Sequence, residues 1–346
     1  MGTSQFLPFY ERLSARLSRN IFGRVLISLV LGFAFVAVHF LAVHYAGVGT
    51  DIFSDWSWFL GVLISTAMLC LYIATSTLHA LLSRLAIYSA NNPVYHARLK
   101  DTLSDRNFVV VGAFFGTLNC VLGYSFGLPY SNGQAIISIL FGYFVVGFIG
   151  GMGLLGIFGV FVAMRVFARD LKPSLDFTSP DNCGGTQFIG ETLVVFSSVT
   201  LIVGVMISTY IIETNWSGHT SGITGLRYFW IVFPYVMSLI ILIAPAIPLH
   251  LELRQYKLEQ EDLFNRRLAV IRQSLEDGQL DGTKRKELRD DHEFGQNARR
   301  ELYQMRLWPY GIGASSKYII VLIVNSIATF HSLSGWINSL LILTWR

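Results

Sequence analysis

Four of the polar side chains within the long apolar segments of this chain are the first candidates for a functional site. His39 lies in the first apolar segment, Thr75 and His79 lie in the second, and Asn119 lies in the third. Polar groups are costly in hydrocarbon and often mark a hydrated path, so these residues are candidates to line a pore. The alternative for His39 is an interhelical hydrogen bond, and His79 lies near a segment end, where its ring can reach the interface.

The loop at 176–191 contains the most distinctive short motif, SPDNCGG at 179–185. A Pro-Asp-Asn run beside two glycines is typical of a turn, and Asp181 could cap a short helix. Free backbone amides at Gly184 and Gly185, next to the start of a helix, could instead bind an anion. Asp181, Gly184 and Gly185 are therefore candidates for an anion site, with a capped turn as the alternative.

Other chemistry has little support in these residues. His39 and His44 are five positions apart, which does not match the i, i+4 spacing of helical metal ligands, so we expect neither a metal nor another cofactor. Cys183 has no general base at a fixed distance, and the carboxylates near it do not form a catalytic cluster. We therefore expect no enzymatic activity.

Glycine and proline concentrate in two of the apolar segments. Gly147 and Gly151 form a GxxxG pair, which lets two helices approach closely, either within one subunit or between subunits around a pore. Pro234 lies in the middle of the sixth segment, and Pro245 and Pro248 lie near its end. Proline kinks a helix, so these three positions are candidates for a gating hinge, with a static bend as the alternative.

The elements that position these residues are predicted to be membrane helices. The 346 residues are 53% hydrophobic and 14% charged, whereas soluble domains carry about 25% charged residues. A spanning helix needs about 20 mostly apolar residues. Six segments meet that requirement: 25–46, 58–81, 108–128, 135–164, 188–212 and 228–249. A seventh, 317–344, is apolar but contains several polar residues, so whether it crosses, re-enters or lies along the interface is left open.

The distribution of basic residues predicts the orientation. Arginine and lysine precede the first segment, fill the second loop and follow the fourth segment, whereas the alternate loops carry almost none. Only Arg227, in the fifth loop, departs from this pattern. Basic residues favour the cytoplasmic side, so we expect the N-terminus and the charged region at 250–306 to be cytoplasmic. The net charge of +4 is clustered at membrane boundaries, so we expect no nucleic-acid partner.

The charged region is predicted to be a helical hairpin. One apolar stripe is predicted from the 4-3-4 spacing of Phe264, Leu268, Ile271 and Leu275, and the glycines in 277–283 favour a turn. Helices as polar as these two arms are only marginally stable in isolation, so we expect them to pack on each other or on a neighbouring subunit. The chain then divides into four parts: an amphipathic segment at 1–24, a transmembrane domain at 25–249, the hairpin at 250–306, and a membrane-associated or seventh transmembrane segment at 307–346.

One resemblance bears on the setting. The motif at 179–185, together with Trp308 and Pro309 after the hairpin, resembles a Pro-Asp-x-x-Gly-Gly segment of uncharacterised bacterial multi-pass membrane proteins. In those proteins histidine often precedes the proline, whereas this chain has Ser179. The resemblance covers about a tenth of the chain and implies a bacterial inner-membrane location, without a known chemistry.

Taken together, these features predict an all-α membrane protein surrounded by lipid. The function that the sequence favours is a homo-oligomeric channel or pore, gated or assembled through its cytoplasmic hairpin, because none of the carboxylates that ion coupling needs lies well inside an apolar segment. The alternative is a non-conducting sensor or scaffold whose hairpin, 250–306, recruits a cytoplasmic protein. A secondary transporter would need paired repeats with broken helices, and no internal repeat is evident.

Overall fold

The computed structural model describes residues 21–47, 56–88, 101–127, 133–171, 175–214, 220–276 and 281–344. The predicted amphipathic segment at 1–24, apart from 21–24, and the hairpin turn at 277–280 lie outside these ranges. Within them the chain is helical or irregular and contains no strand, which confirms an all-α fold.

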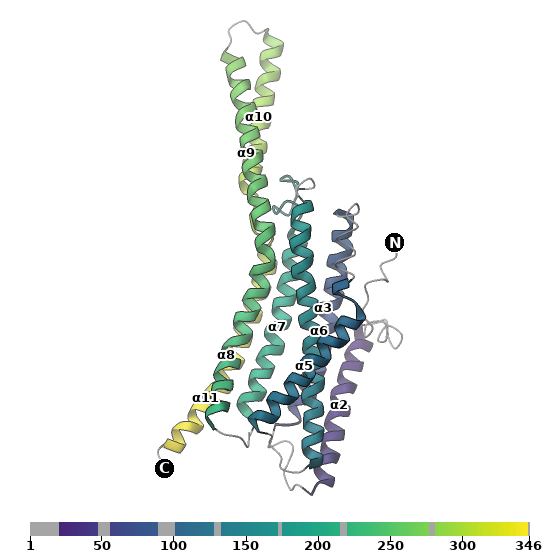
Figure 1. Cartoon of the computed structure of the whole chain (residues 1–346). Coiled ribbons are helices and arrows are strands. Elements are labelled where there is room, and N and C mark those ends of the chain that lie inside the picture. Colours follow the sequence, from purple (N-terminus) through teal and green to yellow (C-terminus); the bar gives the residue numbers. More distant parts are fainter. Residues whose placement is uncertain are drawn as a thin grey trace.

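Among the residues in these ranges, seven helices are long and apolar enough to cross a membrane. At 1.5 Å per residue, each reaches about 30 Å or more, the thickness of the hydrocarbon core. They include the six predicted segments and a continuous helix in the segment that was left open (Figure 1). Their bounds are α2 Ile21–Tyr45, α3 Phe59–Tyr88, α5 Asp105–Phe126, α6 Gly133–Leu171, α7 Gln187–Glu213, α8 Thr220–Ile243 and α11 Ile312–Thr344.

A helical hairpin projects from one end of the bundle. Helix α8 continues through a short 3-10 turn, η3 Ala244–Ala246, into α9 Ile247–Glu276, and α10 Gly282–Gln304 returns alongside it. Figure 1 shows these two arms extending well beyond the bundle, while the C-terminus lies at the opposite end. The arms pack through the predicted stripe, because a Cβ at Gly295 would lie 2.9 Å from Leu268 Cδ2. We call this end of the bundle the hairpin end.

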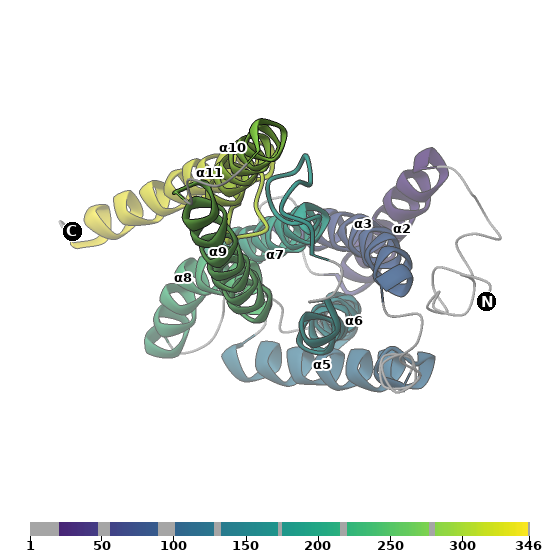
Figure 2. The same ribbon diagram turned by 90° about the horizontal axis from the view of Figure 1, so that it is seen from above.

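Close contact between α5 and α6 depends on two facing glycine pairs. A Cβ built at Gly147 would lie 2.6 Å from the Phe115 carbonyl oxygen and 2.9 Å from Gly116 Cα. A Cβ at Gly151 would lie 3.1 Å from Gly112 Cα. The two helices lie side by side (Figure 2). The GxxxG pair on α6 therefore serves packing within the subunit, the alternative that the sequence left open.

Hydroxyl groups join α11 to the bundle. Ser238 Oγ on α8 lies 2.8 Å from Ser197 Oγ on α7 and 2.8 Å from the Tyr318 hydroxyl on α11. Further along α11, the Tyr235 hydroxyl lies 2.7 Å from Thr329 Oγ1. Polar residues in the last apolar segment thus make interhelical hydrogen bonds, which is why they are compatible with a buried helix face.

We expect Ser238→Ala to destabilise the folded protein by about 1–2 kcal/mol, since interhelical hydrogen bonds in membranes contribute about 0.6 kcal/mol each and this hydroxyl joins two helices. Unfolding in mixed micelles with increasing SDS measures the effect. The matched control is Ser316→Ala on α11, whose exposed hydroxyl bonds only its own helix at Ile312. Equal losses in both variants would contradict the role assigned to Ser238.

Arg227, the one basic residue that departs from the predicted charge asymmetry, has a local role. Its Nε donates to the Ile211 carbonyl at 3.3 Å, and its Nη2 donates to the Thr214 carbonyl at 3.4 Å. Both carbonyls belong to the C-terminus of α7, where a cation is stabilised by the helix dipole and by unsatisfied carbonyl groups. Arg227 therefore caps a neighbouring helix.

Candidate functional site: the joint between bundle and hairpin

Three segments meet where the hairpin leaves the bundle, and we call residues 175–190, 249–257 and 302–311 the joint. The first is the turn that leads into α7, the second is the base of α9, and the third links α10 to α11. Most of its apolar side chains belong to the same buried cluster as the bundle core, so the hairpin base is packed as protein interior. Its buried side chains include Leu175, Cys183, Ile189, Leu249, Leu253, Leu302 and Met305.

Asp181 organises the turn. Its Oδ1 accepts hydrogen bonds from the backbone amides of Cys183 at 2.8 Å and Gly185 at 3.0 Å, and its Oδ2 accepts one from Gln187, the first residue of α7, at 3.1 Å. Burial alone would raise the pKa of Asp181, but these bonds and one from Ser179 lower it below its ordinary value. A carboxylate at a helix N-terminus is also favoured by the helix dipole.

These bonds bear directly on the predicted anion site. The amides of Gly185 and Gln187, which a bound anion would need, already donate to Asp181. A second anion would face the Asp181 charge at close range. The arrangement therefore favours the capped turn over an anion site at Asp181, Gly184 and Gly185.

Left-handed backbone conformations shape the same turn. Asn182 has φ 53°, Gly184 has φ 64° and Gly185 has φ 85°. Glycine adopts such angles without steric cost. A Cβ at Gly184 would also lie 2.9 Å from Met305 Cε and 3.4 Å from Leu253 Cδ2. Glycine is thus required both by backbone conformation and by the close approach of the hairpin.

The turn and the segment after the hairpin are hydrogen bonded to each other. The Arg306 amide donates to the Asn182 carbonyl at 2.6 Å. The Cys183 thiol lies 3.6 Å from the Trp308 carbonyl oxygen. The two parts of the motif quoted from the sequence, 179–185 and 308–309, are therefore neighbours in space although more than a hundred residues separate them.

Cys183 is a packing residue in this setting. Its side chain is fully buried, and burial together with the Asp181 charge raises the pKa of the thiol to about 11. A thiol with a raised pKa is protonated at neutral pH and is a weak nucleophile.

An aromatic stack continues the joint toward the membrane. The rings of His250 and Trp308 stack with centroids 4.4 Å apart, and Trp308 stacks in turn on Tyr310. His250 Nδ1 donates to the Leu307 carbonyl at 3.0 Å, and the Tyr310 hydroxyl donates to the Leu242 carbonyl on α8. The stack thus attaches the chain after the hairpin to both α8 and α9.

Lys257 links α9 to the C-terminus of α10 at the joint. Its Nζ donates to the carbonyls of Tyr303 at 3.0 Å and Met305 at 3.1 Å. These carbonyls lie at the C-terminus of α10, where no intrahelical partner is available. The Tyr303 hydroxyl donates to Glu261 Oε1 at 2.6 Å, so the bases of both arms are crosslinked by polar contacts.

The predicted pore-lining residues are not gathered along one path. His39 Nδ1 on α2 lies 2.8 Å from Ser138 Oγ on α6, so His39 makes the interhelical hydrogen bond that was the alternative to lining a pore. Thr75 donates to the Leu71 carbonyl of its own helix, and Asn119 donates to the Tyr143 carbonyl at 2.7 Å. Thr75 and His79 border the same small cavity of about 20 Å³, whereas Asn119 borders a different and larger one.

The predicted hinge prolines lie in three different settings. Pro234 lies inside α8 and contacts α7 tightly, because a Cβ at Gly204 would lie 2.5 Å from Pro234 Cβ. Pro245 is buried in η3, and Pro248 lies in the first turn of α9. The close fit at Gly204 favours a static bend at Pro234.

Several residues that hold the bundle and the joint together were not predicted from the sequence. Gly112 and Gly116 on α5 form a second GxxxG pair that is visible in the sequence and could have been recognised. Gly190 had no such signal: a Cβ there would lie 1.9 Å from the Pro309 carbonyl oxygen. Lys257 belongs to a long charged region in which nothing distinguishes a capping lysine from a solvated one.

Among the residues that the structure describes, no group of three or more His, Cys, Asp or Glu side chains could hold a metal ion. Comparison with family models, with curated proteins and with solved structures finds no match for this chain.

Proposed function

We propose that this protein is a non-conducting membrane sensor or scaffold whose hairpin recruits a partner protein. The observation that carries the proposal is the joint, which fixes a long polar hairpin to the membrane bundle through a buried core and hydrogen bonds. A flexible tether would need none of these contacts, whereas a docking platform gains from a fixed orientation, because preorganisation lowers the entropic cost of binding.

The outer surface of the hairpin carries apolar side chains that the chain itself does not cover. Val270 is 63% exposed on α9 and Phe294 is 75% exposed on α10, with Leu258 and Leu263 also exposed. These side chains lie among charged residues on arms beyond the bundle, where lipid does not cover them. Apolar groups rimmed by charge are typical of a protein-binding surface.

The homo-oligomeric channel that the sequence favoured has less support. Gly147 and Gly151, which a subunit interface or pore wall could have used, contact α5. His39, Thr75 and Asn119 each make a hydrogen bond within the subunit. A secondary transporter would require a polar site near the midplane, and the larger cavity has a mainly apolar lining.

We propose a bacterial inner-membrane location with the hairpin and the N-terminus on the cytoplasmic side. Arg24 and Arg84 support this orientation, since both lie toward the hairpin end, and basic residues favour the cytoplasmic side. The seven helices then place the C-terminus across the membrane. We also propose that the chain has no enzymatic activity of its own.

Photo-crosslinking in cells tests the function. A photoreactive amino acid at Val270 and at Phe294 is expected to give an adduct with the same soluble protein at both positions. The matched control is Phe141, which is 58% exposed on the membrane helix α6 and should give no such adduct. Adducts from all three positions alike, or from none, would contradict the proposal.

Ion flux separates the proposal from a channel. Purified protein in liposomes is expected to leave ion flux at the level of empty liposomes. A variant in which 262–297 is replaced by a short glycine-serine linker keeps the joint and removes the tip of the hairpin. A flux in the full chain that this variant changes would favour the channel and overturn the proposal.

A further inference from the structure

The larger of the two cavities mentioned above has a volume of about 410 Å³ and lies within the membrane bundle, away from the joint. It is bordered by α3, α5, α6, α7 and α8, between the α5–α6 pair and the α7–α8 pair (Figure 2). Nearly all of its lining is apolar, with the hydroxyl pair of Tyr143 and Tyr210 and the amide of Asn119 among the few polar groups. Its volume and composition fall in the range of small-molecule sites.

The cavity opens sideways, toward the surface that faces lipid. Four large apolar side chains of its lining are also exposed on the outside of the bundle: Leu118 at 38%, Leu122 at 43%, Leu154 at 37% and Phe229 at 52%. They come from α5, α6 and α8. The neighbours of this opening are therefore the hydrocarbon chains of the bilayer.

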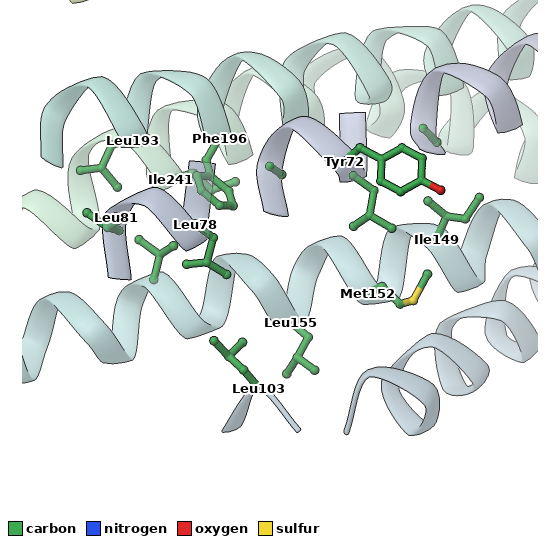
Figure 3. Packing of buried hydrophobic residues seen from close by; sticks show 14 of the residues in the cluster. Tyr72, Leu78, Leu81, Leu103, Ile149, Met152, Leu155, Leu193, Phe196 and Ile241 are labelled. Carbon is green, nitrogen blue, oxygen red and sulfur yellow. The ribbon is translucent and has the colours of Figure 1, made fainter. Parts of the chain in front are cut away.

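Toward the hairpin end the cavity adjoins a smaller one of about 20 Å³, with which it shares Phe196 and three other lining residues. Leu78 and Met152, which are labelled with Phe196 in Figure 3, border only the smaller cavity. The lining along α6 extends from Tyr143 to Ile157, which is about 21 Å at 1.5 Å per residue. The cavity is thus long, and its lining begins near the end of the bundle opposite the hairpin.

Two glycines of α6 keep the cavity open. A Cβ at Gly150 or at Gly153 would meet no atom within 4 Å, and both residues border the cavity. Gly147 and Gly151 border the cavity as well, but a Cβ at either would meet atoms of α5. Of these four glycines, Gly150 and Gly153 are therefore the ones at which a larger side chain would fit and fill cavity space.

We propose that this cavity binds one acyl chain of a membrane phospholipid, which enters sideways between α5 and α8. A cavity lined by apolar side chains does not hold water stably and takes up apolar ligands. Left unfilled, its lining would lose dispersion contacts that a hydrocarbon chain restores. The length of the cavity exceeds one leaflet, about 15 Å, by only a few ångströms, which suits an acyl chain whose headgroup stays at the interface opposite the hairpin.

This inference goes beyond the proposed function and does not depend on the hairpin having a partner. An acyl chain in the cavity would also contact helix α8, because Phe233, Pro234 and Met237 border the cavity. Helix α8 continues through η3 into α9 of the hairpin.

A photoreactive phospholipid tests the proposal. The full chain is reconstituted in nanodiscs that contain a phospholipid with a diazirine in the middle of one acyl chain. Adducts at Val203, a partly buried residue that lines the cavity, are compared with adducts at Val232, which is 58% exposed to lipid on α8. Gly150→Phe is expected to lower the ratio of Val203 to Val232 adducts about tenfold or more, a loss of about 1.4 kcal/mol in binding.

Matched variants keep the result interpretable. Gly313→Phe on α11, where a Cβ also meets no atom within 4 Å, lies outside the cavity and should leave the ratio unchanged. Gly150→Ala and Gly150→Val fill less space and should lower the ratio in graded steps, so the series remains decisive if Gly150→Phe does not fold. A ratio that is equal in all folded variants, or the absence of Val203 adducts in the wild type, would overturn the proposal.

Discussion

Gly190→Ala is expected to destabilise the protein by about 3 kcal/mol or more, because the added methyl group has no space at the joint. A Cβ there would lie 1.9 Å from the Pro309 carbonyl oxygen and 2.6 Å from its carbon. Both atoms are backbone, so relief requires the chain after the hairpin to move away from α7. Unfolding of the full chain in mixed micelles with increasing SDS measures the loss.

The control for this prediction is Gly313→Ala on α11. That glycine is exposed in a helix, and a Cβ there would meet no atom within 4 Å. Alanine should stabilise the helix there by up to about 1 kcal/mol, through its higher helix propensity. The same substitution is thus expected to act in opposite directions at the two sites. A neutral or stabilising effect at Gly190 would contradict the close approach of Pro309.

Asp181→Ala is expected to cost about 2–4 kcal/mol, because it removes a helix cap and leaves three backbone amides without their acceptor. Asp181→Asn should cost less, since one side-chain oxygen remains to accept hydrogen bonds. The matched control is Asp176→Ala, whose carboxylate accepts bonds from the amide and hydroxyl of Thr178 in an exposed part of the same turn. A loss at Asp176 as large as at Asp181 would contradict the central role of Asp181.

The pH dependence of stability has a definite sign. The pKa of Asp181 is lowered in the folded state relative to its ordinary value of 3.8, so the ionised carboxylate stabilises the fold. This contribution is present in full above the unfolded pKa and is lost as pH falls through the folded pKa. Unfolding measured from pH 7 down to below pH 4 should show the loss in the wild type only at the acid end. In Asp181→Asn that contribution to the pH dependence should be absent.

Hydropathy was sufficient to predict the membrane class and the course of the six helices, because lipid excludes unpaired charge over every span. The seventh helix was harder to recognise because polar residues such as Asn325 and Ser326 interrupt its apolar pattern. In the structure the Asn325 side-chain amide donates to the Val321 carbonyl of its own helix, and the Tyr235 hydroxyl of α8 bonds the Asn325 backbone carbonyl and contacts Thr329. Which face a polar residue lies on depends on its neighbours, and hydropathy does not contain that information.

The joint could be predicted only in part. The turn chemistry at 179–185 is local, and the capped turn was one of two alternatives that the sequence left open. The contacts of Cys183 with Trp308 and of Gly190 with Pro309 join segments more than a hundred residues apart, so no local pattern reports them. Similarly, nothing in the sequence separates Gly150, which faces a cavity, from Gly151, which touches α5.

The joint is expected to hold the hairpin in one orientation on the membrane bundle. Pulsed electron paramagnetic resonance, with genetically encoded spin labels at Phe294 on α10 and Val109 on α5, measures the distribution of distances between the two parts. Both positions are exposed, so the labels should not disturb packing. One narrow distribution of label-to-label distances is expected in the wild type, and a broad one is expected in Asp181→Ala. A broad distribution in the wild type would contradict a single orientation of the hairpin.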